Sequence, residues 1–176
     1  MNVSLVLTVI GPDRPGIVEA LADKAAAFEA NWEESRMARL SGQFAGILRI
    51  SVPQARADAL TTALAQLEAE GLKVVVEKIA AAGPDERFRT LTLEIVGNDR
   101  AGIVREISHE LTRRGINVEE LNTECDSAPM SGQILFKASA RLSVPGDVSI
   151  DDLQGSLERI AADLMVDLSL DESTSG

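Results

Sequence analysis

The chain has 176 residues, a hydrophobic fraction of 45% and a formal net charge of −11. This acidic balance, with no cluster of Lys and Arg, argues against direct binding to nucleic acid, because phosphate contacts require basic side chains. No apolar run approaches the roughly 18 residues of a membrane-spanning helix, no signal-peptide pattern is present, and a single cysteine excludes an internal disulfide. We therefore expect a soluble, cytoplasmic protein.

The first 80 residues show the patterns of a strand, a helix, two strands, a helix and a strand. Residues 3–10 alternate with period two, which predicts a strand, and Ile17, Leu21, Ala25 and Phe28 then recur at helical spacing. Further strands are predicted at 31–40 and 44–52, around a turn at 41–43. A second helix is predicted from Gln54 to Gly71, and a fourth strand at 72–79.

One stretch of sequence occurs twice. Gly11-Pro12-Asp13-Arg14-Pro15-Gly16-Ile17 follows the first strand, and Gly97-Asn98-Asp99-Arg100-Ala101-Gly102-Ile103 lies 86 positions later. In each copy an apolar alternating run ends at a glycine, and a helical pattern begins after the second glycine. Such a loop presents unpaired backbone N–H groups at the positive end of a helix dipole, which suits a carboxylate. The duplication predicts two similar modules.

The second half repeats the order of elements. Asn117 matches Asn31 at the same offset of 86, and a hairpin longer than that of the first half is predicted at 126–132. Ser149 with Asp152 resembles the capping box of a helix, and the last strand is predicted at 165–170. We predict a first module at residues 1–80, a linker at 81–88, a second module at 89–170 and a frayed tail at 171–176.

Each module therefore has the order βαββαβ. Two interleaved β-α-β crossovers give a four-stranded antiparallel sheet with both helices on one face, which is the ferredoxin-like arrangement of the α+β class. Val6 and Ile10 alternate with Leu5, Leu7 and Val9, so both faces of the first strand are apolar. This pattern predicts that the helix-free face or an edge packs against another module or chain.

These residues resemble the ACT domain, a regulatory module that binds amino acids. Each module carries Gly-x-Asp-Arg-x-Gly-Ile-Val after its first strand and an Asn at the start of its second strand. Two such modules, with Ala128-Pro129-Met130-Ser131-Gly132 in the second hairpin, are similar to the bacterial glycine cleavage system transcriptional repressor group. The resemblance covers residues 3–170 and implies a ligand held between modules, against the loop and the start of the first helix.

The resemblance implies one set of ligand-binding positions in each module. They are Gly11, Asp13, Arg14, Gly16, Ile17 and Asn31 in the first, and Gly97, Asn98, Asp99, Arg100, Gly102, Ile103 and Asn117 in the second. Glycine lets the backbone approach a ligand closely, helix N–H groups bind its carboxylate, and a side-chain amide or carboxylate binds its ammonium. Serine-sensing relatives tend to have Asn at the positions of Asp13 and Asp99. A carboxylate there repels the ligand's own carboxylate unless Arg14 or Arg100 offsets its charge.

Each of these positions also has a purely structural interpretation. Gly16 and Gly102 would permit tight packing of helix on strand, Asp13 and Asp99 would cap the helices, the two arginines would be solvated, and Asn31 and Asn117 would be turn residues. His109 is expected on an exposed helix face, and Cys125 in a buried strand position or near the hairpin. Met130 lies between Pro129 and Ser131 at a polar tip, which makes these three residues a candidate partner contact.

No nucleophile lies beside a base, and no phosphate loop and no Cys or His cluster occurs, so we predict no enzyme activity, no cofactor and no metal site. The predicted function is regulatory. By resemblance, a small amino acid, glycine or serine, is expected to bind at the interfaces between modules, and the protein is expected to be a homo-oligomer. It is expected to act on a transcription activator or a metabolic enzyme through protein contact. Binding to membranes or directly to nucleic acid is not expected. Two alternatives stay open: a structural scaffold of ACT modules, and a regulatory subunit of an amino-acid metabolic enzyme without a ligand of its own.

Overall fold

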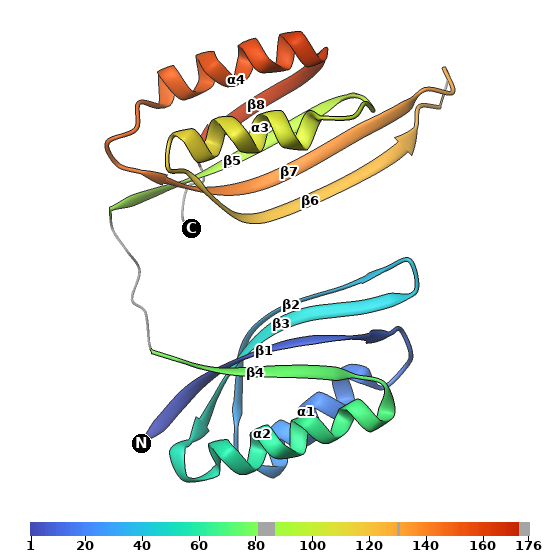
Figure 1. Ribbon diagram of the computed structural model, residues 1–176, viewed down its shortest axis with the longest axis vertical. Helices are drawn as coiled ribbons and strands as arrows, with labels where there is room; N and C mark the ends of the chain where they lie inside the picture. Colours follow the sequence, from blue (N-terminus) through green and yellow to red (C-terminus); the bar gives the residue numbers. More distant parts are fainter. Residues whose placement is uncertain (81–86, 130, 173–176) are drawn as a thin grey trace. The chain divides into compact units, whose positions relative to one another are not determined.

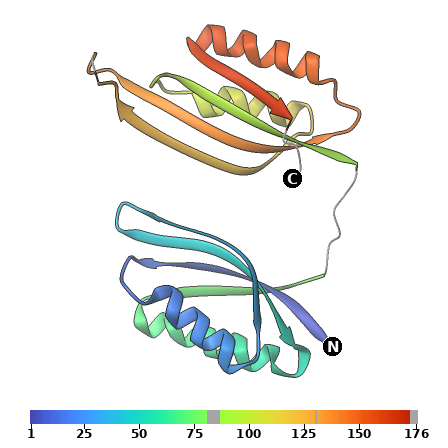
Figure 2. The same ribbon diagram turned by 180° about the vertical axis from the view of Figure 1, so that it is seen from behind.

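A computed structural model of the chain describes residues 1–80, 87–129 and 131–172. The chain forms two compact units, Met1–Gly83 and Pro84–Gly176 (Figure 1). Each unit has one four-stranded antiparallel sheet with its helices on one face, as Figures 1 and 2 show. The predicted fold class, two ferredoxin-like βαββαβ modules in tandem, is confirmed.

The first module pairs its strands in the order β2-β3-β1-β4. Its elements are β1 (Asn2–Pro12), α1 (Ile17–Ala27), β2 (Asn31–Leu40), β3 (Gln43–Pro53), η1 (Gln54–Arg56), α2 (Ala57–Ala65), η2 (Gln66–Glu70) and β4 (Lys73–Ile79). The helix predicted from Gln54 to Gly71 is α-helical only over its nine central residues, because the two ends, η1 and η2, are 3-10 helices.

The second module repeats this topology in the order β6-β7-β5-β8. Its elements are β5 (Phe88–Asn98), α3 (Ile103–Arg113), β6 (Asn117–Ser127), β7 (Ile134–Pro145), α4 (Ile150–Leu164) and β8 (Val166–Glu172). The Ser149 side chain caps α4 by accepting a hydrogen bond from the backbone N–H of Asp152, as the sequence predicts. Residues 81–86, Met130 and 173–176, which belong to the predicted linker, hairpin contact and tail, lie outside the described residues.

The alternation along the first strand of each module decides which face of the sheet is buried. Leu5, Leu7 and Val9 of β1 are almost fully buried against the helices, and Leu91, Leu93 and Ile95 of β5 occupy the matching positions. Each module therefore has its own aliphatic core between one sheet face and two helices. Among the described residues, no helix is long and apolar enough to cross a membrane.

Candidate functional site

The loop after the first strand of each module ends at a glycine that caps the next helix. Gly16 precedes α1 with a φ of 90°, and Gly102 precedes α3 with a φ of 102°, a region that other residues rarely adopt. In the described part of the chain no side chain caps either helix. The expectation that Asp13 and Asp99 are N-caps is therefore wrong, and the first N–H groups of α1 and α3 have no side-chain acceptor. Tight packing does not explain the two glycines either, since a Cβ on Gly102 would meet no atom within 4 Å.

Gly11 and Gly97, at the start of the two loops, are glycines for a different reason. A Cβ on Gly11 would lie 2.5 Å from the carbonyl oxygen of Gly71, and one on Gly97 would lie 2.5 Å from Cγ1 of Val166. Both neighbours belong to the chain that leads into or begins the adjacent edge strand. The space beside these two glycines is therefore filled by the protein itself.

The two loop aspartates have different surroundings, although both loops are held to the hairpin of their module. The backbone N–H of Asp13 donates to the carbonyl of Gly42, and that of Asp99 to the carbonyl of Ile134, each at 2.9 Å. The carboxylate of Asp13 also pairs with Nε of Arg39 at 2.9 Å. Within residues 1–80, 87–129 and 131–172, the carboxylate of Asp99 makes no hydrogen bond or ion pair. The second loop therefore presents an uncompensated acid, whereas the first does not.

The loop arginines bind the C-terminal end of the second helix of their own module. Nη2 of Arg14 donates to the carbonyl of Glu70 at 3.1 Å, and Nη1 of Arg100 donates to the carbonyls of Asp163 and Leu164, both at 3.4 Å. A cation is favourable there, because helix C-terminal carbonyls lack partners and carry the negative end of the dipole. The prediction that these arginines are merely solvated is wrong. The contact with Glu70, Asp163 and Leu164 spans more than fifty residues, which is why local sequence patterns did not show it.

Replacing Arg100 with glutamine is expected to lower the free energy of unfolding of the second module by about 0.5–1 kcal/mol, through loss of this cap. Urea unfolding followed by circular dichroism measures the change. Arg105→Gln is the matched control on α3, since its side chain is 85% exposed and pairs with the neighbouring Glu106. An equal loss of stability in both variants would show that the carbonyl contacts contribute nothing.

Asn31 and Asn117 lie at the opposite end of the sheet from the loop of the same module. Asn31 of β2 pairs with Ser51 of β3, and Ser51 pairs in turn with Ser4 near the start of β1. Gly11 lies near the other end of β1. Seven residues of strand separate the two levels, which corresponds to about 23 Å. The same register places Asn117 level with the start of β5. One module therefore does not bring its asparagine to its own loop.

Three further predicted positions face away from the loop. The side chains of Ile17 and Ile103 are 3% and 2% exposed in the cores, so only their backbone N–H groups remain available to a ligand. The alternation along β5 directs the exposed side chain of Asn98 to the helix-free face of the sheet. Pro129 and Ser131 in the predicted partner-contact hairpin are exposed.

An apolar groove follows the edge of the second module between α3 and β6, beside the loop. It is lined by Leu93, Ile95, Ile103, Val104, Ile107, Ser108, Leu111, Val118, Leu121, Phe136, Ala138 and Ala140. The sheet register places Ala140 at the position that Leu48 has in the first module, and Thr123 at the position of Met37. The differences go both ways, since Leu121 and Ala138 stand where the first module has the smaller Ser35 and Gly46, so side-chain size alone does not explain this groove. Sequence reasoning missed it, because no local motif marks it.

A polar cluster lies between the two helices of the second module. The Glu110 carboxylate is 7% exposed and pairs with Nε of Arg114 at 2.7 Å and with Nη1 of Arg113 at 3.0 Å. Arg114 also donates to Oγ of Ser156 at 2.6 Å. The hydrogen bond from Arg114 holds the pKa of Glu110 below its ordinary value, against the opposing effect of burial. Lys24 and Phe28 occupy the positions of Glu110 and Arg114 in the first module, so the cluster is particular to the second.

The lone histidine and the lone cysteine are both exposed. His109 is exposed, as predicted. Cys125 lies in β6 close to the hairpin, but its side chain is exposed, so the expectation of a buried position is wrong. Among the described residues, no group of three or more His, Cys, Asp or Glu side chains is placed to hold a metal ion.

The fold and the duplicated loop define a protein of two similar ferredoxin-like modules in tandem. Residues 4–77, most of the first module, match the family model of the ACT domain, and the second module repeats the strand order and loop of the first. ACT domains are regulatory modules that bind amino acids.

Two solved structures match the chain over its length. An unknown protein from Galdieria sulphuraria is 30% identical, with a TM-score of 0.88 over 99% of this chain and 100% of that chain. A proposed glycine cleavage system transcriptional repressor is 20% identical, with a TM-score of 0.71 over 99% of each chain, and this likeness shows the shared two-module fold. No curated protein sequence matches the chain.

Proposed function

We propose that this protein is a non-enzymatic cytoplasmic regulator whose ACT modules bind a small amino acid, glycine or serine, and which acts on a transcription regulator through protein contact. The observation that carries the proposal is the duplicated loop, since the helix that follows has no side-chain cap in either module. A ligand carboxylate would accept hydrogen bonds from these N–H groups at the positive end of the helix dipole. The shared fold with a proposed glycine cleavage system transcriptional repressor supports glycine metabolism as the regulated process.

The second loop is the better proposed site. An amino acid needs a partner for its ammonium as well as for its carboxylate, and Asp99 has a carboxylate without an ion-pair partner in the described residues. Asp13 is already neutralised by Arg39, whose position in the second module is taken by Cys125. The ligand carboxylate would lie at the N-terminus of α3 and its ammonium at Asp99.

The position of Asn117 supports a site shared by two copies of the chain. Asn117 opens β6, which is an edge strand, and lies at the far end of the sheet from its own loop. If the β6 strands of two copies run antiparallel at this edge, the start of one lies beside the end of the other. Asn117 of a second copy would then reach the loop at Gly97–Gly102 and complete the site.

Calorimetric titration with each of the twenty amino acids is expected to detect binding of glycine or serine, and Asn117→Ala is expected to weaken it at least tenfold, because an amide contact is lost. Valine and leucine are informative competitors, since the apolar groove between α3 and β6 adjoins the loop. Asn122→Ala is the matched control on the same strand, because Asn122 lies in the middle of β6 rather than at its start, and its side-chain amide donates to Glu120.

If calorimetry detects no binding of any of the twenty amino acids to the wild-type chain, the proposed sensing function is wrong. Equal loss of affinity in the Asn117 and Asn122 variants would remove Asn117 from the site. If binding is found, transcripts of glycine-degrading enzymes should respond to glycine in cells with the wild-type or Asn122→Ala chain and fail to respond with Asn117→Ala. The exposed hairpin ends Pro129 and Ser131 are the proposed contact with the transcription regulator.

A second candidate function, a structural scaffold of ACT modules, is favoured by the first loop. There Asp13 pairs with Arg39 and Arg14 binds Glu70, so both charged side chains of the loop are used by the chain itself. A scaffold would lose assembly or stability when Gly16 and Gly102 are replaced by larger residues. A sensor would instead lose its response to the ligand at a smaller cost in assembly.

A further inference from the structure

The helix-free face of the first module keeps exposed aliphatic side chains. This face, here called the open face, is formed by alternate residues of its four strands, with Glu33 added at the bulge of β2 through its ion pair with Arg49: Ser4, Val6, Thr8, Ile10, Glu33, Glu34, Arg36, Ala38, Leu40, Ala45, Ile47, Arg49, Ser51, Lys73, Val75, Glu77 and Ile79. Ile47 is 52% exposed, Ile10 48%, Val75 46% and Ile79 37%. A sheet that has one face in water normally places polar residues there.

The register concentrates these side chains in the middle of the sheet. Thr8 is paired with Ile47 on one side and with Val75 on the other, which gives a row across β3, β1 and β4. Ile10 lies two residues along β1, with Val6 two residues in the other direction. Aliphatic side chains from β3, β1 and β4 therefore surround Thr8 on this face.

The helix-free face of the second module carries mostly polar residues at the positions that match the open face. Each pair of matched positions has the same place in the sheet register: Val6 and Thr92, Thr8 and Glu94, Ala38 and Glu124, Leu40 and Asp126, Ala45 and Lys137, Ile47 and Ser139, Lys73 and Asp167, Val75 and Ser169, Glu77 and Asp171. At most of these positions an apolar or basic residue in the first module corresponds to a polar or acidic one in the second. Ile10 is matched by Val96, but the fold does not require the aliphatic residues Val6, Ile47 and Val75, so another contact must account for these three.

The open face of the first module is neutral, whereas the matching face of the second module is acidic. On the open face, three acidic side chains, Glu33, Glu34 and Glu77, are balanced by three basic ones, Arg36, Arg49 and Lys73. The described residues of the matching face in the second module carry an excess of acid: Glu94, Glu119, Glu120, Glu124, Asp126, Asp167 and Asp171 against Lys137 and Arg141. Two copies of a chain with a net charge of −11 repel one another in general. The open face is neutral, so two copies can meet there without this repulsion.

We propose that the open face of the first module is a homodimer interface, packed face to face against the same face of a second copy. Two sheets stack in this way about 10 Å apart, with the side chains of the inner faces in contact. The contact is symmetric, so a neutral face with equal numbers of acids and bases is self-complementary. It differs from the β6 edge contact proposed above and does not require an amino acid.

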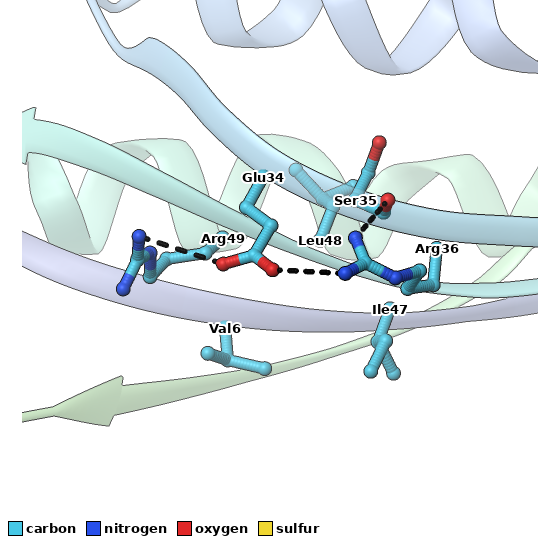
Figure 3. Close-up of a pocket in the computed structure, with 7 residues that line it drawn as sticks. All are labelled: Val6, Glu34, Ser35, Arg36, Ile47, Leu48 and Arg49. Atoms are coloured by element: carbon cyan, nitrogen blue, oxygen red, sulfur yellow. Dashed lines mark hydrogen bonds and ion pairs between the residues drawn. The ribbon is translucent and has the colours of Figure 1, made fainter. Parts of the chain in front are cut away.

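The ion pairs of the open face lie to one side of the apolar row. Glu34 is 3.6 Å from Nη2 of Arg49 and 3.3 Å from Nη2 of Arg36, and Figure 3 shows Glu34 between these two arginines, with Val6 and Ile47 beside them. All three charged residues come from β2 and β3, whereas the row continues through β1 to β4. A dimer centred on the row would leave these ion pairs at a polar rim, where they need not be desolvated.

Sedimentation velocity of the full chain without amino acid, from about 1 to about 100 μM, tests the proposal. The wild-type chain is expected to dimerise, and the double variant Ile47→Ser with Val75→Ser to associate at least tenfold more weakly. Serine occupies the matched positions Ser139 and Ser169, so the substitutions copy residues that this fold accepts. Because the contact is apolar, the dimer is expected to persist in about 1 M salt, where screening is strong.

Val96→Ser is the matched control, since Val96 is 42% exposed on the helix-free face of the second module. It should leave the dimer unchanged. Circular dichroism and Trp32 fluorescence check that the double variant folds, and Thr8→Glu, which copies Glu94, replaces it if it does not. A wild-type monomer over the whole range, or a dimer equally strong in the open-face variants, would overturn the proposal. Either result would leave amino-acid binding, measured by calorimetry, unaffected.

Discussion

Replacing Gly11 with alanine is expected to lower the free energy of unfolding of the first module by about 2–3 kcal/mol. The new Cβ would lie 2.5 Å from the carbonyl oxygen of Gly71 and 3.3 Å from Cα of Leu72. Both are backbone atoms that cannot rotate away, so the entry to β4 must shift and its pairing with β1 must weaken. Fluorescence of Trp32, the single tryptophan of the chain, follows urea unfolding of this module. A loss of this size corresponds to a fall in Tm of roughly 10 °C or more for a module of this length.

Gly155→Ala is the matched control, with an expected effect of the opposite sign. Gly155 lies inside α4, and a Cβ there would meet no atom within 4 Å. Alanine should therefore stabilise the helix by up to about 1 kcal/mol, because it has the higher helix propensity. Gly97→Ala should resemble Gly11→Ala in the second module, since its Cβ would lie 2.8 Å from Cα of Val166. If Gly11→Ala leaves stability unchanged but abolishes amino-acid binding, Gly11 contacts the ligand and our structural explanation is wrong.

The sequence was sufficient for the topology, because the signals for it are local. Period-two and helical patterns, with turn residues such as Gly42 between them, define each element within a few residues. The duplication around Gly11 and Gly97 then made the order of elements a repeated observation. The cap at Ser149 was predicted for the same reason, since its partner is three residues away.

The surroundings of the candidate site were less predictable, because they depend on contacts between distant segments. The partner of Arg14 is 56 residues away in the sequence, and that of Asp13 lies on the neighbouring hairpin. The sheet register alone places Asn31 at the far end from its loop, so a motif that seemed to form one site is divided between two ends of a module. The aliphatic residues of the open face, such as Ile10, were visible as alternation, but their contrast with the second module needed the register of both sheets.

Glu110→Gln is expected to destabilise the second module by about 1–3 kcal/mol at neutral pH. Glutamine keeps the size of the side chain but removes the charge that accepts hydrogen bonds from Arg113 and Arg114. Two guanidinium groups would then share one neutral amide between the helices. Urea unfolding followed by circular dichroism measures the loss. Glu106→Gln is the control on the same helix, because that carboxylate is 46% exposed, and a change below about 0.5 kcal/mol is expected.

The difference between wild type and Glu110→Gln should depend on pH in one direction. Arg114 and Arg113 lower the pKa of folded Glu110 from its ordinary value of 4.5, so the unfolded chain takes up a proton at higher pH than the folded one. The stabilisation by the carboxylate is therefore complete well above pH 4.5 and is lost as the pH falls through the lowered pKa of the folded state. The difference between the two proteins should therefore shrink as the pH falls below 4.5. A difference that stays constant as the pH falls would show that the Glu110 carboxylate does not stabilise the cluster of Arg113, Arg114 and Ser156.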